Sequence, residues 1–165
     1  MASMSAPTIG IDLGTSCGWA LLLPDGACVG SGTWDLKGHR HDSHGMRVVR
    51  LRRNVAELVN SQLSVAHTVK PLVAYEAVEQ RHKSADAAHL YGALRAGLQE
   101  VCAALGVELV GVPVSTVKRT ATGKGNAGKP EMLAAAAAKW PTAAKRDDNE
   151  ADALWVAECA RTGRF

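Results

Sequence analysis

Three short apolar runs separated by turn residues open the chain. They cover residues 9–13, 18–23 and 27–34, and alternation is weakest in the third. Gly14-Thr15-Ser16 and Pro24-Asp25-Gly26 lie between the runs, and both have the composition of tight turns. Consecutive strands joined by short turns pair with their neighbours in sequence. The pattern therefore predicts an antiparallel meander.

Helical and strand patterns then alternate. Apolar residues recur at helical spacing over residues 46–66, and a short apolar strand follows at residues 72–76. Ser84 can cap a second helix that runs to about Leu105, and residues 107–112 have the composition of another strand. A strand, a helix and a strand in this order predict a right-handed parallel crossover added to the meander.

The segment from residue 114 to residue 130 is basic, polar and rich in glycine, and we expect a mobile loop there. Residues 123–129 match GxxxxGK, but Pro130 replaces the hydroxyl residue that would bind Mg²⁺ in a phosphate-binding loop. Pro130 instead opens an alanine-rich helix that reaches Trp140. Asp147 then has the position of a cap for the last helix.

Length and composition indicate one domain, residues 1–165, with enough apolar residues for a core. The formal net charge of +3 permits a polyanionic partner without requiring one. No apolar run reaches membrane-spanning length, and the first residues do not form an export signal. We expect neither membrane insertion nor export, and we place the protein in the cytoplasm of a bacterial or phage-infected cell.

Acidic residues interrupt three apolar segments. Asp12 and Glu76 lie on predicted strands, and Asp152 lies in the last helix with Asp148 one helical turn earlier. A buried carboxylate is costly unless it is paired or binds a cation. Three or four oxygen ligands suit a pair of Mg²⁺ ions, so these acids are candidate metal ligands. Strand-end acids that face water, and acids that only start a helix, are the simpler alternatives.

Basic and histidine residues raise two further possibilities. Arg47, Arg50 and Arg53 crowd the first turns of the helix over 46–66, where a solvated face competes with a face that contacts phosphates. The polar segment before it contains three histidines, but no cysteine lies nearby and the setting has the character of a solvated loop. We therefore predict no zinc site there.

With these motifs in order, the chain resembles the RuvC family of Holliday junction resolvases, within the ribonuclease H-like superfamily, and its phage-type members most. The matching segments are GIDLGTSCGWA at 10–20, VAYEAVEQ at 73–80, VPVSTVKRTATGKGNAGKPEM at 112–132 and DDNEADALWVA at 147–157. The resemblance implies an α/β fold of the ribonuclease H-like type. Its five-stranded mixed sheet has an antiparallel meander followed by parallel strands, helices on both faces, and a homodimer as the working form.

The resemblance also assigns roles to residues. It implies metal-ligating acids at Asp12, Glu76 and Asp152, with a fourth ligand near the start of the last helix. Asn149 stands where the family usually has an acid or histidine, so either Asn149 or Asp148 completes the set, and we favour Asp148. Lys118 and Lys129 match basic positions near the scissile phosphate. The aromatic wedge that some members carry soon after the strand-end glutamate is missing.

The sequence thus leads to the hypothesis of a Mg²⁺-dependent endonuclease for branched DNA, with Mn²⁺ as a substitute. Two ions would promote hydrolysis to 5′-phosphate and 3′-hydroxyl ends. Catalysis is assigned to Asp12, Glu76, Asp148, Asp152, Lys118 and Lys129, and DNA contact to Arg47, Arg50, Arg53, Lys118, Arg119, Lys124 and Lys129.

Two other classes of protein remain open. The fold could serve as a branched-DNA-binding module in which Asn149 has cost activity. Alternatively, IDLGTS at residues 11–16 also resembles the first phosphate loop of actin-like and sugar-kinase proteins, although those need two such domains. A junction, a flap, a fork or an RNA-containing hybrid would each suit the same acids.

Overall fold

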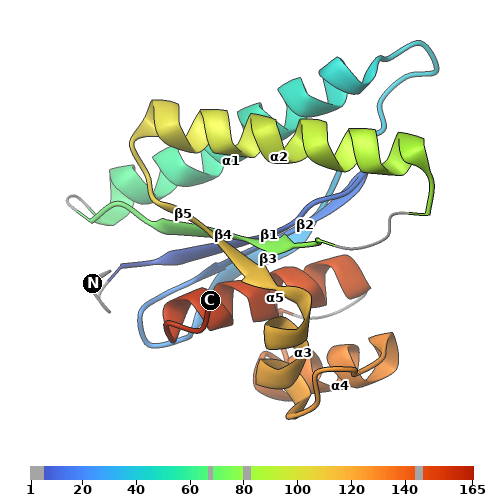
Figure 1. Cartoon of the computed structure of the whole chain (residues 1–165). Coiled ribbons are helices and arrows are strands. Elements are labelled where there is room, and N and C mark those ends of the chain that lie inside the picture. The colour runs from blue at the N-terminus through green and yellow to red at the C-terminus, as the bar shows by residue number, and fades with distance from the viewer. Residues whose placement is uncertain (1–5, 67–68, 80–82, 144–146) are drawn as a thin grey trace.

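One mixed sheet organises the computed structural model, which describes residues 6–66, 69–79, 83–143 and 147–165. The strand order is β3-β2-β1-β4-β5 (Figure 1). β1, β2 and β3 are antiparallel neighbours, whereas β4 runs parallel to β1 and β5 parallel to β4. The predicted meander with added parallel strands is confirmed. The strands are β1 (Thr8–Asp12), β2 (Ser16–Leu22), β3 (Cys28–Asp35), β4 (Leu72–Ala77) and β5 (Leu109–Pro113).

Helices cover both faces of the sheet, as predicted (Figure 1). α1 (His44–Ala66) and α2 (Ala85–Leu105) lie on one face. α5 (Asp148–Arg161) packs directly on the other face, against β1 and β2, and α3 (Val114–Thr122) and α4 (Lys129–Lys139) pack against α5. No helix among the described residues is long and apolar enough to cross a membrane.

The alternation of side chains along each strand divides the core residues between the two faces of the sheet. Ile9, Ile11 and Tyr75 belong to the cluster under α1 and α2. Ala74 and Val112 belong to the cluster under α5. Since side chains alternate along a strand, residues two positions apart share a face. A polar residue on a strand therefore lies on the same face as the apolar residues two positions before and after it.

Helix α2 begins and ends at the predicted residues. The Ser84 side chain accepts a hydrogen bond from Ala87 N, and Gly106 ends α2 in the left-handed conformation with φ 62°. Of the two glycines within α2, Gly97 lies against α1, because a Cβ there would be 2.5 Å from Val48 Cγ1. Gly92 has no such neighbour within 4 Å.

The prediction of a mobile loop over residues 114–130 is wrong for its first half, which is α3. Val117 lies on the buried face of this helix, and Gly123 ends the helix in the left-handed conformation. Gly123 therefore marks the end of a short amphipathic helix, and the segment is not a loop over its whole length. Pro130 lies in the first turn of α4, as expected, and Trp140 is its C-cap.

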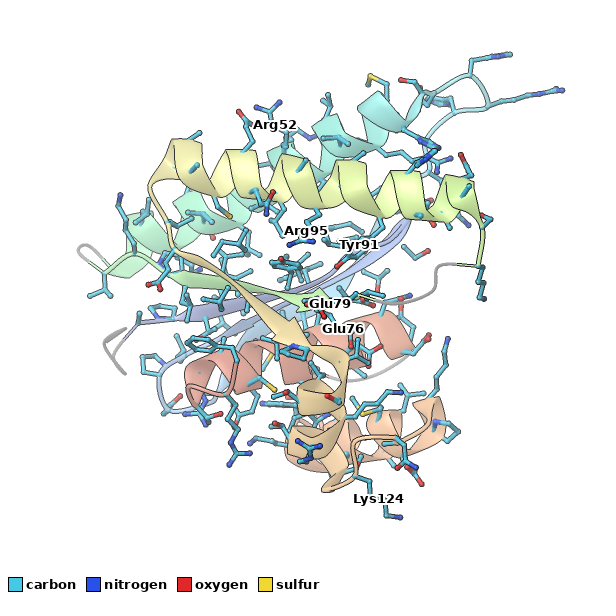
Figure 2. The ribbon with its side chains drawn as sticks, viewed as in Figure 1. Arg52, Glu76, Glu79, Tyr91, Arg95 and Lys124 are labelled. Carbon is cyan, nitrogen blue, oxygen red and sulfur yellow. The ribbon has the colours of Figure 1, made fainter. Side chains whose placement is uncertain are left out.

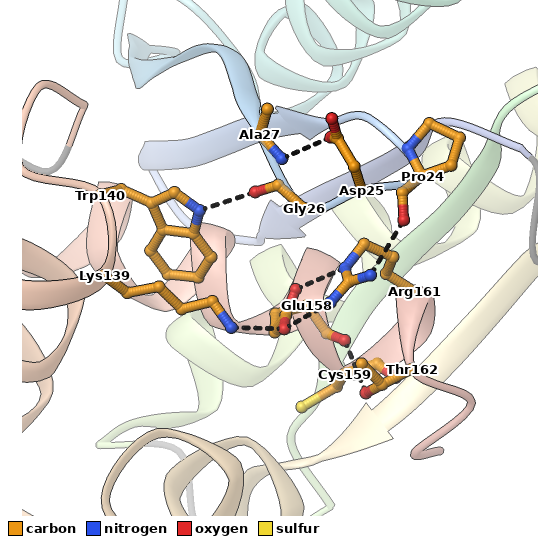
Figure 3. Close-up of polar contacts among 10 residues, drawn as sticks. All are labelled: Pro24, Asp25, Gly26, Ala27, Lys139, Trp140, Glu158, Cys159, Arg161 and Thr162. Carbon is orange, nitrogen blue, oxygen red and sulfur yellow. Dashed lines mark hydrogen bonds and ion pairs between the residues drawn. The ribbon is translucent and has the colours of Figure 1, made fainter.

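Glu158 ties the far end of α5 to its surroundings (Figure 3). Its side chain is 5% exposed and accepts hydrogen bonds from Lys139 Nζ at 2.5 Å and Arg161 Nε at 2.7 Å. Arg161 Nη1 also donates to Pro24 O at 2.9 Å, and Trp140 Nε1 donates to Gly26 O at 3.0 Å. The β2–β3 turn, α4 and α5 are thus joined at the end of α5 opposite its N-terminus.

Candidate functional site

Asp12 and Glu76 lie side by side on the face of the sheet covered by α5. Asp12 shares its face with Gly10, and Glu76 shares its face with Ala74, which belongs to the core under α5. The parallel register pairs Ile11 with Tyr75, so the next residue on each strand is one of the two acids. Both acids therefore sit at the carboxyl edge of neighbouring strands.

Two glycines allow α5 to approach this face closely. A Cβ on Gly10 would overlap Ala153 O and lie 2.6 Å from Ala157 N, and a Cβ on Gly18 would overlap Asn149 O. Gly18 is also the cross-strand partner of Asp12. The first turn of α5 thus rests on the Asp12–Gly18 pair, which brings Asp152 and Asp148 to the strand-end acids.

The electrostatics show that these carboxyls lie close together. Burial raises the pKa of Asp12 well above its usual value, and three neighbouring carboxylates raise it further, those of Glu76, Asp152 and Asp148. Burial and then the charge of Asp152 raise the pKa of Glu76 to about 7. Burial and then the charge of Asp148 raise the pKa of Asp152 to about 6. The group therefore holds more negative charge than its surroundings neutralise.

Lys129, at the start of α4, forms an ion pair with Asp148. Its hydrogen bond lowers the pKa of Asp148, in contrast to the other three acids. The Lys129 side chain is 78% exposed, so solvent competes strongly with this pair. Lys118, on α3, also lies within electrostatic range of Glu76 and Asp152, whose pKa values it lowers.

The adjacent residues at the start of α5 have different roles. Asp147 caps the helix, because its carboxylate accepts Glu150 N at 2.8 Å and the Thr33 hydroxyl at 2.8 Å. The Glu150 side chain does not complete a capping box with Asp147, because it accepts a hydrogen bond from the Ser31 hydroxyl at 2.6 Å. Asn149 meets Gly18 through its backbone. Asp148 is the residue of this turn whose charge acts on Asp12 and Asp152.

Tyr91 fixes the end of β4 from the opposite face of the sheet. Its hydroxyl donates to Glu76 O at 3.0 Å and accepts Val78 N at 3.0 Å, and Figure 2 shows the ring beside Glu76. No pattern in the sequence indicates this role for Tyr91, because its strand partner Glu76 lies 15 residues earlier in the chain. Gly10 and Gly18 carry a signal in the sequence, because glycine within an apolar strand indicates a close backbone approach.

The donor chemistry of the acid group fits a divalent cation. Carboxylate oxygens are the ligands that Mg²⁺ prefers, and mutual repulsion among buried carboxylates favours a cation between them. Within the described residues, no three His, Cys, Asp or Glu side chains stand close enough together to share one ion as placed. Coordination would therefore require these side chains to reorient.

The predicted DNA-contacting cations are spread over both faces. Arg53 and Arg119 are exposed, and Arg47 is half-buried. Arg50 pairs with Asp42 instead of facing solvent, with its side chain 19% exposed. Lys124 is exposed, but it lies beyond α3, far from Glu76 (Figure 2). Lys118 and Lys129 are the predicted cations that lie at the acids. Gln80, Arg81 and His82, where the missing wedge was noted, lie outside the described residues.

Comparison with known proteins identifies the fold. No family model and no curated protein matches the chain. Among solved structures, RuvC of T. thermophilus in complex with a Holliday junction substrate has a TM-score of 0.79 at 22% identity, covering 96% of this chain and 97% of that one. Another structure of Thermus thermophilus RuvC has a TM-score of 0.73 at 20% identity, with the same coverage.

A eukaryotic resolvase is similar over nearly the whole of this chain. The yeast mitochondrial Holliday junction resolvase Ydc2 has a TM-score of 0.64 at 13% identity, covering 97% of this chain and 79% of its own. All three similarities extend through the sheet and the helices on both of its faces. The protein therefore has the ribonuclease H-like fold of the RuvC Holliday junction resolvases.

Proposed function

We propose that this protein is a divalent-metal-dependent endonuclease that resolves Holliday junctions or other branched DNA. The observation that carries the proposal is the convergence of Asp12, Glu76 and Asp152 at one edge of a RuvC-type sheet. The acids come from three distant segments of the chain. A structural neighbour bound to a Holliday junction substrate supports branched DNA as the ligand.

Asp12, Glu76 and Asp152 would hold two Mg²⁺ ions, with Asp148 as the fourth ligand. When bound, the ions supply an activated water and stabilise charge on the phosphate and the leaving 3′-oxygen. Asp148 is preferred over Asn149 because its charge acts on Asp12 and Asp152. Asn149 would support the site through its packing on Gly18.

Lys118 and Lys129 would neutralise the scissile phosphate. Lys118 lies on α3 near Glu76 and Asp152, and Lys129 lies on α4 beside Asp148. A cation held in place before substrate arrives stabilises developing charge without reorganisation. Lys129 would exchange its partner, from the Asp148 carboxylate to the phosphate. Mn²⁺ would replace Mg²⁺, because both accept oxygen ligands.

Resolution of a four-way junction needs two cuts, so the working form would be a homodimer that presents two acid groups to one junction. Each cut would leave a 5′-phosphate and a 3′-hydroxyl. Symmetric paired cuts are the expected product of a two-fold symmetric enzyme on a two-fold symmetric substrate. Flaps and forks would be cut once if the site accepts them.

The test compares a labelled four-way junction with linear duplex, a flap and an RNA–DNA hybrid, in Mg²⁺ and in EDTA. Wild type should nick the junction in pairs, and both EDTA and Glu76→Gln should abolish the nicks. Glu57→Gln, an exposed change on α1, is the matched control and should cut normally. If only the flap or the hybrid is cut, the acids would still be the proposed active site, but the substrate would not be a four-way junction.

Two outcomes would favour the alternatives. Tight junction binding with no cleavage in Mg²⁺ or Mn²⁺ would identify a non-catalytic branched-DNA-binding module. Thermal stabilisation by ATP, with no effect of junction DNA, would favour an actin-like or sugar-kinase-like nucleotide site. Either result would refute the nuclease.

A further inference from the structure

The segment between β3 and α1 is tightly braced. Leu36 is fully buried, and its N–H donates to Thr15 O at 2.8 Å. Asp42 accepts His39 N at 2.9 Å and forms an ion pair with Arg50. Gly38, with φ 64°, has the left-handed conformation that lets the chain turn back toward Asp42.

Arg50 is the centre of this brace. Besides pairing with Asp42, its Nη1 donates to Leu36 O at 3.3 Å. The two side chains of the pair are only 19% and 17% exposed, for Arg50 and Asp42 respectively. Arg50 is therefore committed to holding residues 36–42 against α1, rather than to a ligand.

The braced segment presents cations outward. Lys37 and Arg40 are exposed, and within the described part of the chain neither side chain forms an ion pair. His39 and His41 flank Arg40 and are also exposed. The acid within the segment, Asp42, is already neutralised by Arg50. Asp35, the last residue of β3, is also exposed, and its carboxylate accepts a hydrogen bond from the Lys37 backbone N–H at 2.9 Å. Lys37 and Arg40 outnumber this one acid, so the outer surface of the segment has an excess of positive charge.

The helix that follows lacks the acids usual at its start. The first turns of α1 and α3 contain no acidic residue, whereas those of α2, α4 and α5 each have at least one. An acid of α2, Asp86, lies 3.5 Å from His44 Nε2 at the start of α1, but its side chain is 81% exposed. Positive charge near a helix N-terminus is unfavourable unless an anion lies nearby. Arg47 adds to this imbalance, because its Nε is buried without a hydrogen bond to any described residue.

Strand register places this surface at the edge of the sheet that carries the acids. Ser16 pairs with Asp35 and Asp12 pairs with Gly18, so β3 ends at the carboxyl edge of β1. α1 covers the face opposite α5. Cations of the braced segment thus approach the edge from one face, while Lys118 and Lys129 approach it from the other.

We propose that Lys37 and Arg40 form a second DNA-backbone contact, which holds a duplex arm of the branched substrate on the α1 side of the acids. This rests on the proposed function, since the ligand is the same DNA. The brace fixes the backbone that carries the two cations, and phosphate contacts fix the register of a duplex without reading its sequence.

The test measures junction affinity against salt concentration, in Ca²⁺ or EDTA so that cleavage does not interfere. For Lys37→Ala/Arg40→Ala we expect an affinity loss of about tenfold and a salt slope lower by nearly 2, at about 0.9 per phosphate contact. Lys70→Ala/Arg164→Ala removes equal charge at the opposite edge and should change both quantities little. Thermal unfolding of each variant checks that the fold persists.

Asp42→Ala separates positioning from net charge. It makes the protein more positive, so a simple charge effect would tighten DNA binding, whereas loss of the brace should weaken it about two- to fivefold. The inference is overturned if the double variant keeps the affinity and salt slope of wild type, which would leave the nuclease proposal intact. If wild type binds no branched DNA at all, both proposals fall.

Discussion

At the scale of single residues, the ionised acids at the edge of the sheet lower the stability of the folded protein. The pKa of Glu76 is raised from 4.5 to about 7. A carboxyl with a raised folded-state pKa contributes most below its unfolded-state pKa, and this contribution is lost as pH rises toward the folded-state value. Between about pH 4.5 and 7, ionisation of Glu76 should thus progressively destabilise the protein.

Glu76→Gln should therefore raise the unfolding temperature of the EDTA-treated protein at pH 8 while it abolishes cleavage. The shift corresponds to at most roughly 3 kcal/mol, at 1.36 kcal/mol per pKa unit. The difference between variant and wild type should grow from pH 4.5 to pH 7 and then level off, as measured by thermal unfolding. A variant less stable than wild type across that range would show that Glu76 has a structural role instead.

The start of α5 supports a prediction about two adjacent residues. Asp148→Asn should reduce junction cleavage about 10- to 100-fold and raise the Mg²⁺ concentration needed for half-maximal rate, because a ligand or its close partner is lost. Asn149→Ala, which keeps the backbone contact with Gly18, should have a much smaller effect. Cleavage rates over a Mg²⁺ titration measure both. The reverse order of effects would assign the fourth position to Asn149.

At the scale of elements, the approach of α5 to the sheet depends on glycine. Gly10→Ala and Gly18→Ala would each drive a methyl group into backbone atoms of α5, which cannot move aside as a side chain can. We expect each to lower the free energy of unfolding by about 1–3 kcal/mol or more, and to reduce cleavage by displacing Asp152. Urea denaturation measures the first effect.

Gly92→Ala provides the matched control, because no atom lies within 4 Å of a Cβ at that exposed helical position. Alanine should stabilise α2 by about 0.5–1 kcal/mol and leave cleavage unchanged. Equal stability losses at all three glycines would mean that close packing of α5 is not what these residues provide.

The network around Glu158 joins α4, α5 and the β2–β3 turn. Burial alone would raise the pKa of Glu158, but its hydrogen bonds with Arg161 and Lys139 outweigh burial and lower it. A lowered folded-state pKa stabilises the protein above the unfolded-state value, and that contribution is lost as pH falls through the folded-state value. Glu158→Ala should cost about 2–3 kcal/mol at neutral pH, because Arg161, 22% exposed, loses a charged hydrogen-bond partner, whereas Lys139, 39% exposed, can turn toward solvent. Calorimetry at pH 7 measures the loss, and a cost below about 1 kcal/mol would contradict it.

Sequence patterns predicted elements better than contacts. Alternation and turn residues located the five strands, and acids within apolar segments picked out Asp12, Glu76 and Asp152. The first half of the basic segment has too weak an apolar pattern to predict α3, because Val117 is the buried residue of that helix. The role of Arg50 was also missed. Its partner Asp42 is eight residues away across a turn, and charge alone cannot distinguish a brace from a ligand contact.

At the scale of the whole molecule, the acids gather at one edge of the sheet, where Lys118 and Lys129 only partly neutralise them. Bound Mg²⁺ should relieve the repulsion among the acids, because a ligand that binds only the folded state stabilises it. We expect millimolar Mg²⁺ to raise the unfolding temperature at pH 8 by several degrees in wild type and by much less in Asp12→Asn. An equal rise in both would place the stabilising ions elsewhere.

The order of the segments along the chain has a consequence for synthesis. Asp12 and Glu76 belong to the first half of the chain, whereas Asp152 belongs to its last helix, which packs on the first strand. A nascent chain therefore carries two of the acids on an uncovered sheet face until α5 emerges and docks. Contacts between such distant segments form late in folding. Asp152 joins the other two acids only when α5 docks on the sheet, so a chain interrupted before α5 would lack the complete group of acids that the proposed nuclease requires.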